Sequence, residues 1–402
     1  MDILNRANEI ESTLPDSPNK LPMLHLEVGQ PMTSAPSTVI KKAQTTLSTN
    51  KIGYTNAFGL PQLQQKIKDH YVDKYKIDPS SLSTDQIVVT TGSSAGFMLT
   101  FLGAFDRDDT IAVASSGYPC YRNICQTCEI NVDTIEINSE YKITGELLQK
   151  RIDERKELGL KPLNGLILSS PSNPTGSMLS REELEHLCKV CHENEIRFIS
   201  DEIYHGIVYD KSKGEATALS FSKSAIVINS FSKYYSMSGW RLGWLVVPPE
   251  LVSNTNALQQ NLFINAPTLS QNGGLLCWDE DTTEELEENV KEYKKARDLI
   301  LESLERVGIS DVAPADGAFY IYMDISPFIS FEKGLTSIEF CRDFLETEHV
   351  AICDGRDFED PSTDRGGRRI RMSYAGGSKV CAEAMERFER FWVNEWLPKL
   401  SK

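Results

Sequence analysis

Short continuous apolar runs alternate with amphipathic helical patterns through about residue 250 of the chain. Apolar runs of this length are typical of strands that are buried on both faces of a sheet. We predict seven such strands, at residues 86–90, 110–114, 132–137, 163–169, 196–200, 225–228 and 242–247. Because helical patterns lie between most of them, the alternation predicts an α/β fold with a seven-stranded, mostly parallel sheet.

The pattern changes after about residue 280, which indicates a second unit. The features there are an acidic stretch at 279–288, an amphipathic helix at 290–307, and strands at 317–324 and 368–375. Mixed strands and helices of this kind are typical of an α+β domain. We therefore expect a large domain at residues 40–280 and a smaller domain made of residues 1–39 and 281–402.

Composition and charge restrict the class of protein. The chain has 402 residues, of which 40% are hydrophobic and 25% charged, as in ordinary globular proteins. Its formal net charge of −16 argues against a nucleic-acid-binding surface. We find no run of 18 apolar residues that would cross a membrane, and no signal-peptide pattern at the N-terminus. Nine cysteines, an odd number, then favour the reducing cytoplasm.

Two groups of cysteines resemble cofactor or metal sites. The run Cys188-Lys-Val-Cys191-His192 has the spacing of haem attachment, but it lies in a predicted amphipathic helix that Ser180 caps. Cys188 and Cys191 belong to the apolar face of that helix, so we expect core packing instead. A second cluster, at residues 120–128, lacks the matching ligands of a metal site. We expect no metal.

Polar residues follow the predicted strands where each strand ends. Since ligands bind at the carboxyl ends of parallel strands, we expect these side chains to lie close together. They are Ser93, Ser94, Tyr118, Asn173, Asp201, Tyr204, Ser230 and Lys233.

Lys233 is the most informative of these residues. It follows an apolar strand, stands among serines, and precedes Arg241 by eight residues. A lysine in a partly buried, cation-rich site loses its proton readily and acts as an amine nucleophile, whereas most lysines are simply solvated. Serines with an arginine are suited to a phosphate. The combination favours pyridoxal phosphate (PLP), bound to the lysine as a Schiff base.

Other residues match the further needs of this cofactor. The turn Gly92-Ser93-Ser94 opens a predicted helix at 98–105, so its N–H groups and the helix dipole favour an anion, together with Ser230 and Arg241. Taken singly, each has an ordinary alternative, such as a plain turn or a surface ion pair.

The cofactor ring needs groups of its own. A carboxylate keeps the pyridine nitrogen protonated, and Asp201 is suitable. Tyr204 and Asn173 are suited to the phenolic oxygen, and Tyr118 offers a stacking surface. Asp201 is alternatively a helix cap, and Asn173 part of a plain turn.

Three segments resemble those of class I/II aminotransferases, which are fold-type-I PLP-dependent enzymes. They are Ser170-Pro-Ser-Asn-Pro-Thr-Gly176, Asp201-Glu-Ile-Tyr204 and Ser230-Phe-Ser-Lys-x7-Arg241. The likeness extends from Glu27 to Ala375. It implies the PLP-transferase fold and a homodimer whose two active sites are shared between subunits.

The resemblance also implies a role for each site residue. Lys233 would form the Schiff base and act as general base, Asp201 would pair with the pyridine nitrogen, and Arg371 would bind the substrate carboxylate. The phosphate would be bound by Gly92, Ser93, Ser94, Ser230 and Arg241. Tyr118 would stack on the ring, and Tyr204 and Asn173 would hold its phenolic oxygen. Gly29 and Asn173 would assist substrate binding, and Tyr54 would reach the phosphate of the partner subunit.

The implied reaction is ping-pong transfer of an amino group from an L-amino acid to a 2-oxo acid, as part of amino acid metabolism. A carbon–sulfur β-lyase of the same fold is the main alternative, and a non-catalytic regulator is a third. The turn at Gly92 lacks the lysine of some aspartate-specific relatives, and no second substrate arginine is evident. Aromatic, methionine-like and aliphatic amino donors therefore remain open.

Overall fold

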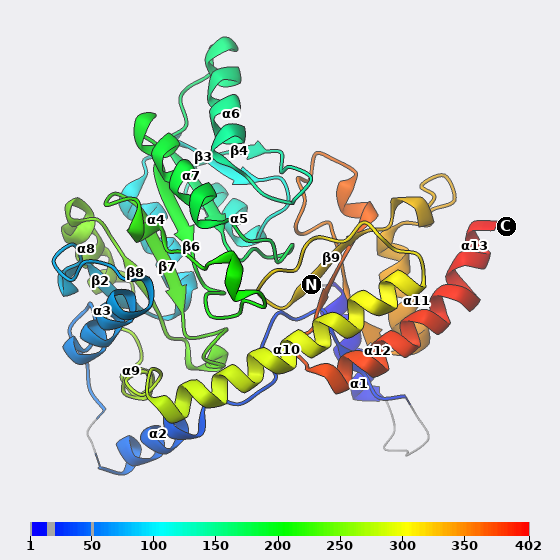
Figure 1. The fold of residues 1–402 in the computed structure, drawn as a ribbon, viewed down its shortest axis with the longest axis horizontal. Helices are drawn as coiled ribbons and strands as arrows, with labels where there is room; N and C mark the ends of the chain where they lie inside the picture. The colour runs from blue at the N-terminus through cyan, green and yellow to red at the C-terminus, as the bar shows by residue number, and fades with distance from the viewer. Residues whose placement is uncertain (1, 14–20, 50–51, 402) are drawn as a thin grey trace.

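A seven-stranded sheet forms the centre of the larger part of the molecule (Figure 1). The computed structural model describes residues 2–13, 21–49 and 52–401. The strands lie in the order β2-β8-β7-β6-β5-β3-β4, and β8 alone runs in the opposite direction to the other six. Their bounds are β2 Ile87–Thr90, β3 Thr110–Ala114, β4 Asn131–Ile135, β5 Gly165–Ser169, β6 Arg197–Asp201, β7 Ile226–Ser230 and β8 Gly243–Val246. The predicted α/β fold with its mostly parallel sheet is confirmed.

Helices cover both faces of this sheet. On one face lie α3 Pro61–Tyr75, α6 Gly145–Glu157 and α7 Arg181–Glu193; on the other lie α4 Gly92–Ala104, α5 Pro119–Thr127 and α8 Val252–Leu262. Successive side chains of a strand point to opposite faces. Val227 of β7 accordingly packs in the core of the first face and Ile228 in that of the second. Burial on both faces explains the continuous apolar runs in the sequence.

The start of helix α7 is determined by hydrogen bonds among its own first residues. The Ser180 hydroxyl accepts a hydrogen bond from the Glu183 N–H, and the Glu183 carboxylate accepts one from the Ser180 N–H, as in a capping box. Cys188 and Cys191 are buried in the core on the sheet side, as predicted. They are therefore structural thiols and not a haem attachment site.

A second group of elements packs beside the sheet domain. It contains a three-stranded antiparallel sheet, β11-β12-β9, and a short parallel pair, β1-β10. The elements are α1 Asp2–Thr13, β1 Leu24–His25, β9 Tyr320–Asp324, α11 Ser337–Glu348, β10 Val350–Ala351, β11 Cys353–Asp354, β12 Arg369–Ser373, α12 Ser378–Phe391, a π-helical turn Trp392–Trp396 and α13 Leu397–Ser401. Two helices, α2 Ser37–Thr49 and α9 Thr268–Gly274, pack together at the edge of the large part.

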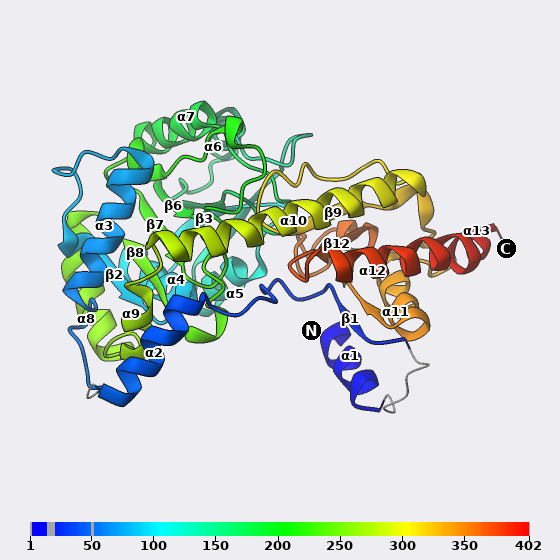
Figure 2. The same cartoon turned by 60° about the horizontal axis from the view of Figure 1, so that its bottom comes forward.

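Helix α10, Glu280–Arg306, joins the two groups. In both views it runs from beside the large sheet to the smaller group (Figures 1 and 2). Leu286 packs in the core of the large sheet, whereas Ile300 and Leu304 pack in the core of the smaller group. We propose the division into residues 40–280 and residues 1–39 with 281–402 on this basis; residues 1, 14–20, 50–51 and 402 lie outside the described part.

Two sequence predictions of helix bounds were wrong. Helix α10 begins at Glu280 and not at 290, because acidic residues in a first turn interact favourably with the helix dipole. Helix α4 begins at Gly92 and not at 98, since the apolar side chains of Ala95 and Phe97 are already buried against the sheet. The second difference places the start of α4 directly at the end of β2.

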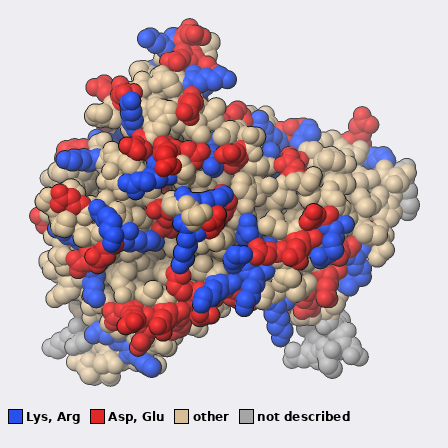
Figure 3. Space-filling view, in the orientation of Figure 1, with Lys and Arg blue, Asp and Glu red and all other residues tan. Residues whose placement is uncertain are grey.

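The surface carries mixed charge. On the face of Figure 3, lysine and arginine side chains are interspersed with acidic ones, and acidic side chains gather over the start of α10. Among the described residues, none of the helices has the length and apolar character needed to span a bilayer.

Candidate active site

Most of the predicted site residues line one cavity of about 530 Å³ at the carboxyl ends of the central strands. It has the size of an ordinary small-molecule site. The predicted residues that line it are Gly29, Ser93, Ser94, Tyr118, Asn173, Asp201, Tyr204, Lys233, Arg241 and Arg371. Gly92 and Ser230 lie behind its wall, and Tyr54 lies elsewhere on the surface with 84% of its side chain exposed.

Lys233 enters the cavity three residues after β7 ends. Its Nζ donates a hydrogen bond of 2.5 Å to the Gly29 carbonyl oxygen. Burial, and then the nearby guanidinium groups of Arg371 and Arg241, lower the pKa of Lys233 to about 8, and Asp201 opposes them only in part. The neutral fraction of this amine near physiological pH is consequently much larger than that of a solvated lysine, and the neutral form is the one that acts as a nucleophile or base.

Asp201 is the last residue of β6 and is only 2% exposed. One carboxylate oxygen accepts a 2.5 Å hydrogen bond from the Tyr121 hydroxyl, and the other accepts one from the Ile203 N–H. Burial raises the pKa of Asp201 to about 6 despite these bonds. A buried carboxylate with this pKa is suited to a cationic partner inside the cavity.

The sequence analysis missed Tyr121. It stands three residues after Tyr118, in the segment that already drew attention. The first turn of α5, which begins at Pro119, brings the two rings together edge to face, with centroids 5.6 Å apart. A second aromatic hydroxyl one helical turn from a cavity residue was the available signal.

The start of α4 and Arg241 form an anion cradle. A Cβ atom at Gly92 would lie 2.5 Å from an Arg241 guanidinium nitrogen, so only glycine lets the arginine approach the start of the helix. Ser93 and Ser94 face the cavity at the positive end of the helix dipole.

The serines on the opposite side of the cradle differ from expectation. The Leu242 carbonyl oxygen, at 3.1 Å, and the Ser232 hydroxyl oxygen, at 2.9 Å, are both within hydrogen-bond distance of the Ser230 hydroxyl, whose single proton is donated to one of them. Ser232 and Ser238, and not Ser230, line the cavity. Ser230 therefore supports the wall that Ser232 presents.

The guanidinium group of Arg371, in β12, packs against two aromatic rings. The ring centroids of Tyr320 and Phe358 lie 4.6 and 4.4 Å from its central carbon. It donates to the Asn173 side-chain oxygen at 3.0 Å and to the Glu27 carbonyl oxygen at 2.5 Å. Its buried Nε has no hydrogen-bond partner among the described residues. A planar arginine with a free donor is suited to a carboxylate.

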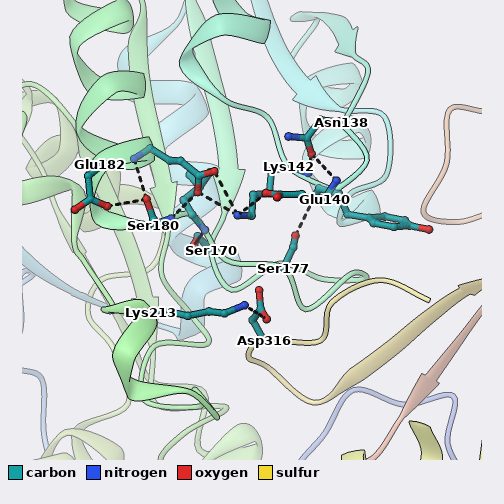
Figure 4. Close-up of polar contacts among 12 residues, drawn as sticks. Asn138, Glu140, Lys142, Ser170, Ser177, Ser180, Glu182, Lys213 and Asp316 are labelled. Atoms are coloured by element: carbon teal, nitrogen blue, oxygen red, sulfur yellow. Dashed lines mark hydrogen bonds and ion pairs between the residues drawn. The ribbon is translucent and has the colours of Figure 1, made fainter. Parts of the chain in front are cut away.

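A clamp holds the segment that carries Asn173 (Figure 4). Lys142 forms ion pairs with Glu140 at 3.1 Å and with Glu183 of α7 at 3.2 Å. The Ser177 hydroxyl donates to the Tyr141 carbonyl oxygen at 2.8 Å. Residues 138–142 and residues 170–183 therefore support each other, which fixes Asn173 against Arg371.

The smaller group of elements packs against the segment that carries Asn173. In Figure 4, Lys213 from the large part points at Asp316, and their charged atoms are 2.5 Å apart. Asp316 stands shortly before β9, the strand that carries Tyr320. Tyr320 donates to or accepts from the Tyr204 hydroxyl at 2.7 Å, so the two parts also meet inside the cavity.

Within residues 2–13, 21–49 and 52–401, no three histidine, cysteine or acidic side chains are placed to hold a metal ion. The charged groups that line the cavity are instead the Lys233 amine, the guanidinium groups of Arg241 and Arg371, and the buried Asp201 carboxylate.

Known proteins resemble this chain over nearly its whole length. The profile of the family described as aminotransferase class I and II matches residues 22–388. A valine–pyruvate aminotransferase of Mycobacterium tuberculosis is 39% identical over 400 residues, which cover 99% of this chain and 95% of that protein. A (5-formylfuran-3-yl)methyl phosphate transaminase of Methanocaldococcus jannaschii is 32% identical, with coverage of 97% and 95%. A crystal structure of an aminotransferase from Mycobacterium tuberculosis has a TM-score of 0.89 at 39% identity, with coverage of 99% and 96%.

The pKa of Lys233 is testable on the ligand-free protein. We expect its acylation by a small amine reagent to increase with pH around a midpoint of about 8 and then to level off, because only the neutral amine reacts. Quantitative peptide mapping by mass spectrometry measures the rate for Lys233 beside those of exposed lysines, which titrate near pH ~10.4. A midpoint for Lys233 equal to that of the exposed lysines would contradict the burial argument.

Proposed function

The chain belongs to the class I and II aminotransferase family, and we propose that it transfers the amino group of valine or a similar aliphatic L-amino acid to pyruvate. It is a PLP-dependent enzyme that moves an amino group from an L-amino acid to a 2-oxo acid. The relatives described above are named as aminotransferases, which supports transamination and not the β-lyase alternative.

The cavity has the groups that PLP needs. The cradle at Gly92 admits an anion beside Arg241, the buried Asp201 suits a protonated ring nitrogen, and Lys233 offers an amine whose pKa is lowered to about 8. When bound, PLP supplies an aldehyde that condenses with amines and a ring that accepts the electron pair released at the substrate α-carbon. The residues present therefore fit the cofactor.

Each residue has a proposed task toward the cofactor. Lys233 would bind it covalently, Asp201 would pair with the ring nitrogen, and Tyr118 would cover the ring. Tyr204 and Asn173 would form hydrogen bonds with the phenolic oxygen. The phosphate would be held by the cradle that Gly92, Ser93, Ser94 and Arg241 form, with Ser230 supporting Ser232.

Substrate binding and proton transfer follow from two side chains. Arg371 would bind the α-carboxylate bidentately through its guanidinium group, with Asn173 and Gly29 assisting. Lys233, once displaced by the incoming amine, would take the proton from the substrate α-carbon as general base. Its low pKa keeps it ready to accept that proton.

The small number of cations in the cavity is the observation that supports an aliphatic amino donor. Among the described residues that line it, the only arginines are Arg241, beside the anion cradle, and Arg371, beside Asn173. No further cation than Lys233 is present there to pair with a side-chain carboxylate, and Val28, Phe97 and Ile203 add apolar surface. An unpaired carboxylate is costly to bury, so an apolar side chain is favoured. The name of the Mycobacterium tuberculosis relative supports valine and pyruvate.

We also propose a homodimer with shared active sites. Tyr54 is exposed, and its loop is held by the Thr268 hydroxyl, which donates to Gly53 at 2.6 Å, and by Gln271, which accepts from Leu60 at 2.7 Å. A rigid loop that presents a tyrosine away from its own cavity is suited to a second copy of the chain. The nine free thiols support a cytoplasmic location.

Replacement of the reactive amine tests the cofactor assignment. We expect Lys233→Ala to abolish turnover and the visible absorbance of lysine-bound PLP, since both require the amine. Absorbance spectra and a coupled assay measure this, with Lys223→Ala, an exposed lysine, as control. Retention of turnover and of the absorbance in Lys233→Ala would refute the assignment.

An amino-donor panel tests the substrate. With pyruvate as acceptor, we expect kcat/KM for valine to exceed that for aspartate by about 100-fold or more, roughly 3 kcal/mol of transition-state binding, because the second carboxylate of aspartate lacks a partner. Equal rates with aspartate and 2-oxoglutarate would overturn the aliphatic assignment and leave transamination intact.

Subunit complementation tests the shared site. Each site would need Lys233 from one chain and Tyr54 from the other. Co-expressed Lys233→Ala and Tyr54→Ala chains should therefore give hybrids with one intact site. We expect their activity and their retention of PLP on dilution to exceed the average of the two separate variants. Activity no higher than that average would show that Lys233 and Tyr54 of different subunits do not act in the same site.

A further inference from the structure

We propose that Tyr320 is a positioning residue for the cofactor: its hydroxyl donates a hydrogen bond to Tyr204 and thereby directs the Tyr204 proton toward the phenolic oxygen of PLP. This inference rests on the proposed task of Tyr204. The carrying observation is a 2.7 Å contact between two buried hydroxyls from different parts of the molecule.

The direction of this hydrogen bond follows from the number of protons. A tyrosine hydroxyl has one proton and two acceptor lone pairs. If Tyr204 donates its proton to the cofactor, its oxygen is an acceptor toward Tyr320, and Tyr320 must donate. Burial raises the pKa values of both tyrosines, so both hydroxyls keep their protons. The pair then forms a chain in which each donation strengthens the next.

The surroundings hold the Tyr320 hydroxyl in one place. A side chain at Gly29 would overlap that hydroxyl, so the glycine provides the space it occupies. The same Gly29 accepts the hydrogen bond from Lys233. The rings of Tyr204 and Tyr320 pack edge to face with centroids 5.6 Å apart. Tyr320 is 1% exposed, which leaves its hydroxyl little freedom to turn away.

The ring of Tyr320 has a separate contact. It covers one face of the Arg371 guanidinium group at 4.6 Å. The charged and titratable groups that act on Tyr320 are Arg371 and Cys353 from the small group of elements, and Tyr204 and Tyr118 from the large one. The hydroxyl and the ring can therefore be tested by different substitutions.

The test of the hydroxyl is a pH titration of the visible absorbance of the holoenzyme. A proton donated to the phenolic oxygen lowers its basicity, so losing the donor moves the midpoint to higher pH. We expect Tyr204→Phe to raise the midpoint, and Tyr320→Phe to raise it by about 10–30% of that shift, the range for one strengthened bond. The double variant should match Tyr204→Phe alone.

A matched control lies two residues along the same strand. Tyr322 is also buried, but its hydroxyl donates to Glu359 at 2.6 Å. Tyr322→Phe should leave the midpoint unchanged, which separates positioning from a general loss of packing. The reading comes only from folded, cofactor-loaded protein, so a lower yield of any variant does not affect it.

The ring is tested by the kinetics. Tyr320→Phe keeps the ring and should leave KM for the amino donor unchanged. Tyr320→Leu removes the cation–π contact and should raise KM on the order of 2- to 30-fold. An unchanged KM in Tyr320→Leu would show that the ring does not support Arg371.

Two results would overturn the inference. An unshifted midpoint in Tyr320→Phe, with a clear shift in Tyr204→Phe, would show that the Tyr320 hydroxyl does not act through Tyr204. Shifts that simply add in the double variant would show the same. Either result leaves the proposed function standing, because that depends on Lys233 and fails only if its replacement leaves turnover and absorbance intact.

Discussion

The proposed chemistry depends on the amine of Lys233, which is buried beside two guanidinium groups. Arg241 and Arg371 both lower the pKa of Lys233, and both are placed to bind anions. In the proposed mechanism the same two charges would bind the phosphate and the carboxylate, and they favour the neutral form of the lysine before either anion binds. Bound anions would offset this repulsion and raise the pKa of Lys233, which would make it a stronger base for the proposed removal of a proton from carbon.

The mostly parallel sheet makes this arrangement possible. Asp201 and Ser230 end neighbouring strands, so groups 29 residues apart in sequence lie at one edge. Arg371 comes from a different sheet and reaches the same cavity only because β9 and β12 pack over that edge. The site therefore exists only where two different sheets meet, and the Lys213–Asp316 ion pair is one of the contacts between the two parts.

The sequence predicted the parts of this structure that are encoded locally. The apolar runs located the strands, and Ser180 with Glu183 located the start of α7, because each signal depends only on neighbouring residues. Lys233, Asp201 and Arg241 were found by residue type and by their place after strands. The Tyr204–Tyr320 pair was not, since its members are 116 residues apart and their contact depends on how the two sheets pack.

The sequence also could not distinguish between two neighbouring serines that have the same chemistry. Ser230 and Ser232 are equally plausible phosphate ligands in the sequence, and only the strand geometry shows that the Leu242 carbonyl engages the first. The acidic stretch at 279–288 was left outside the helix predicted at 290–307, although a helix N-terminus stabilises negative charge.

The unbroken course of α10 has a mechanical consequence. Its 27 residues span about 40 Å, and its side chains complete the hydrophobic cores at both ends of the molecule. A cut within this strut would leave an exposed apolar stripe on each fragment, so neither half is expected to be a self-sufficient folding unit. The two halves are thereby coupled in unfolding. A rotation of one half relative to the other would have to bend α10 or turn about its axis.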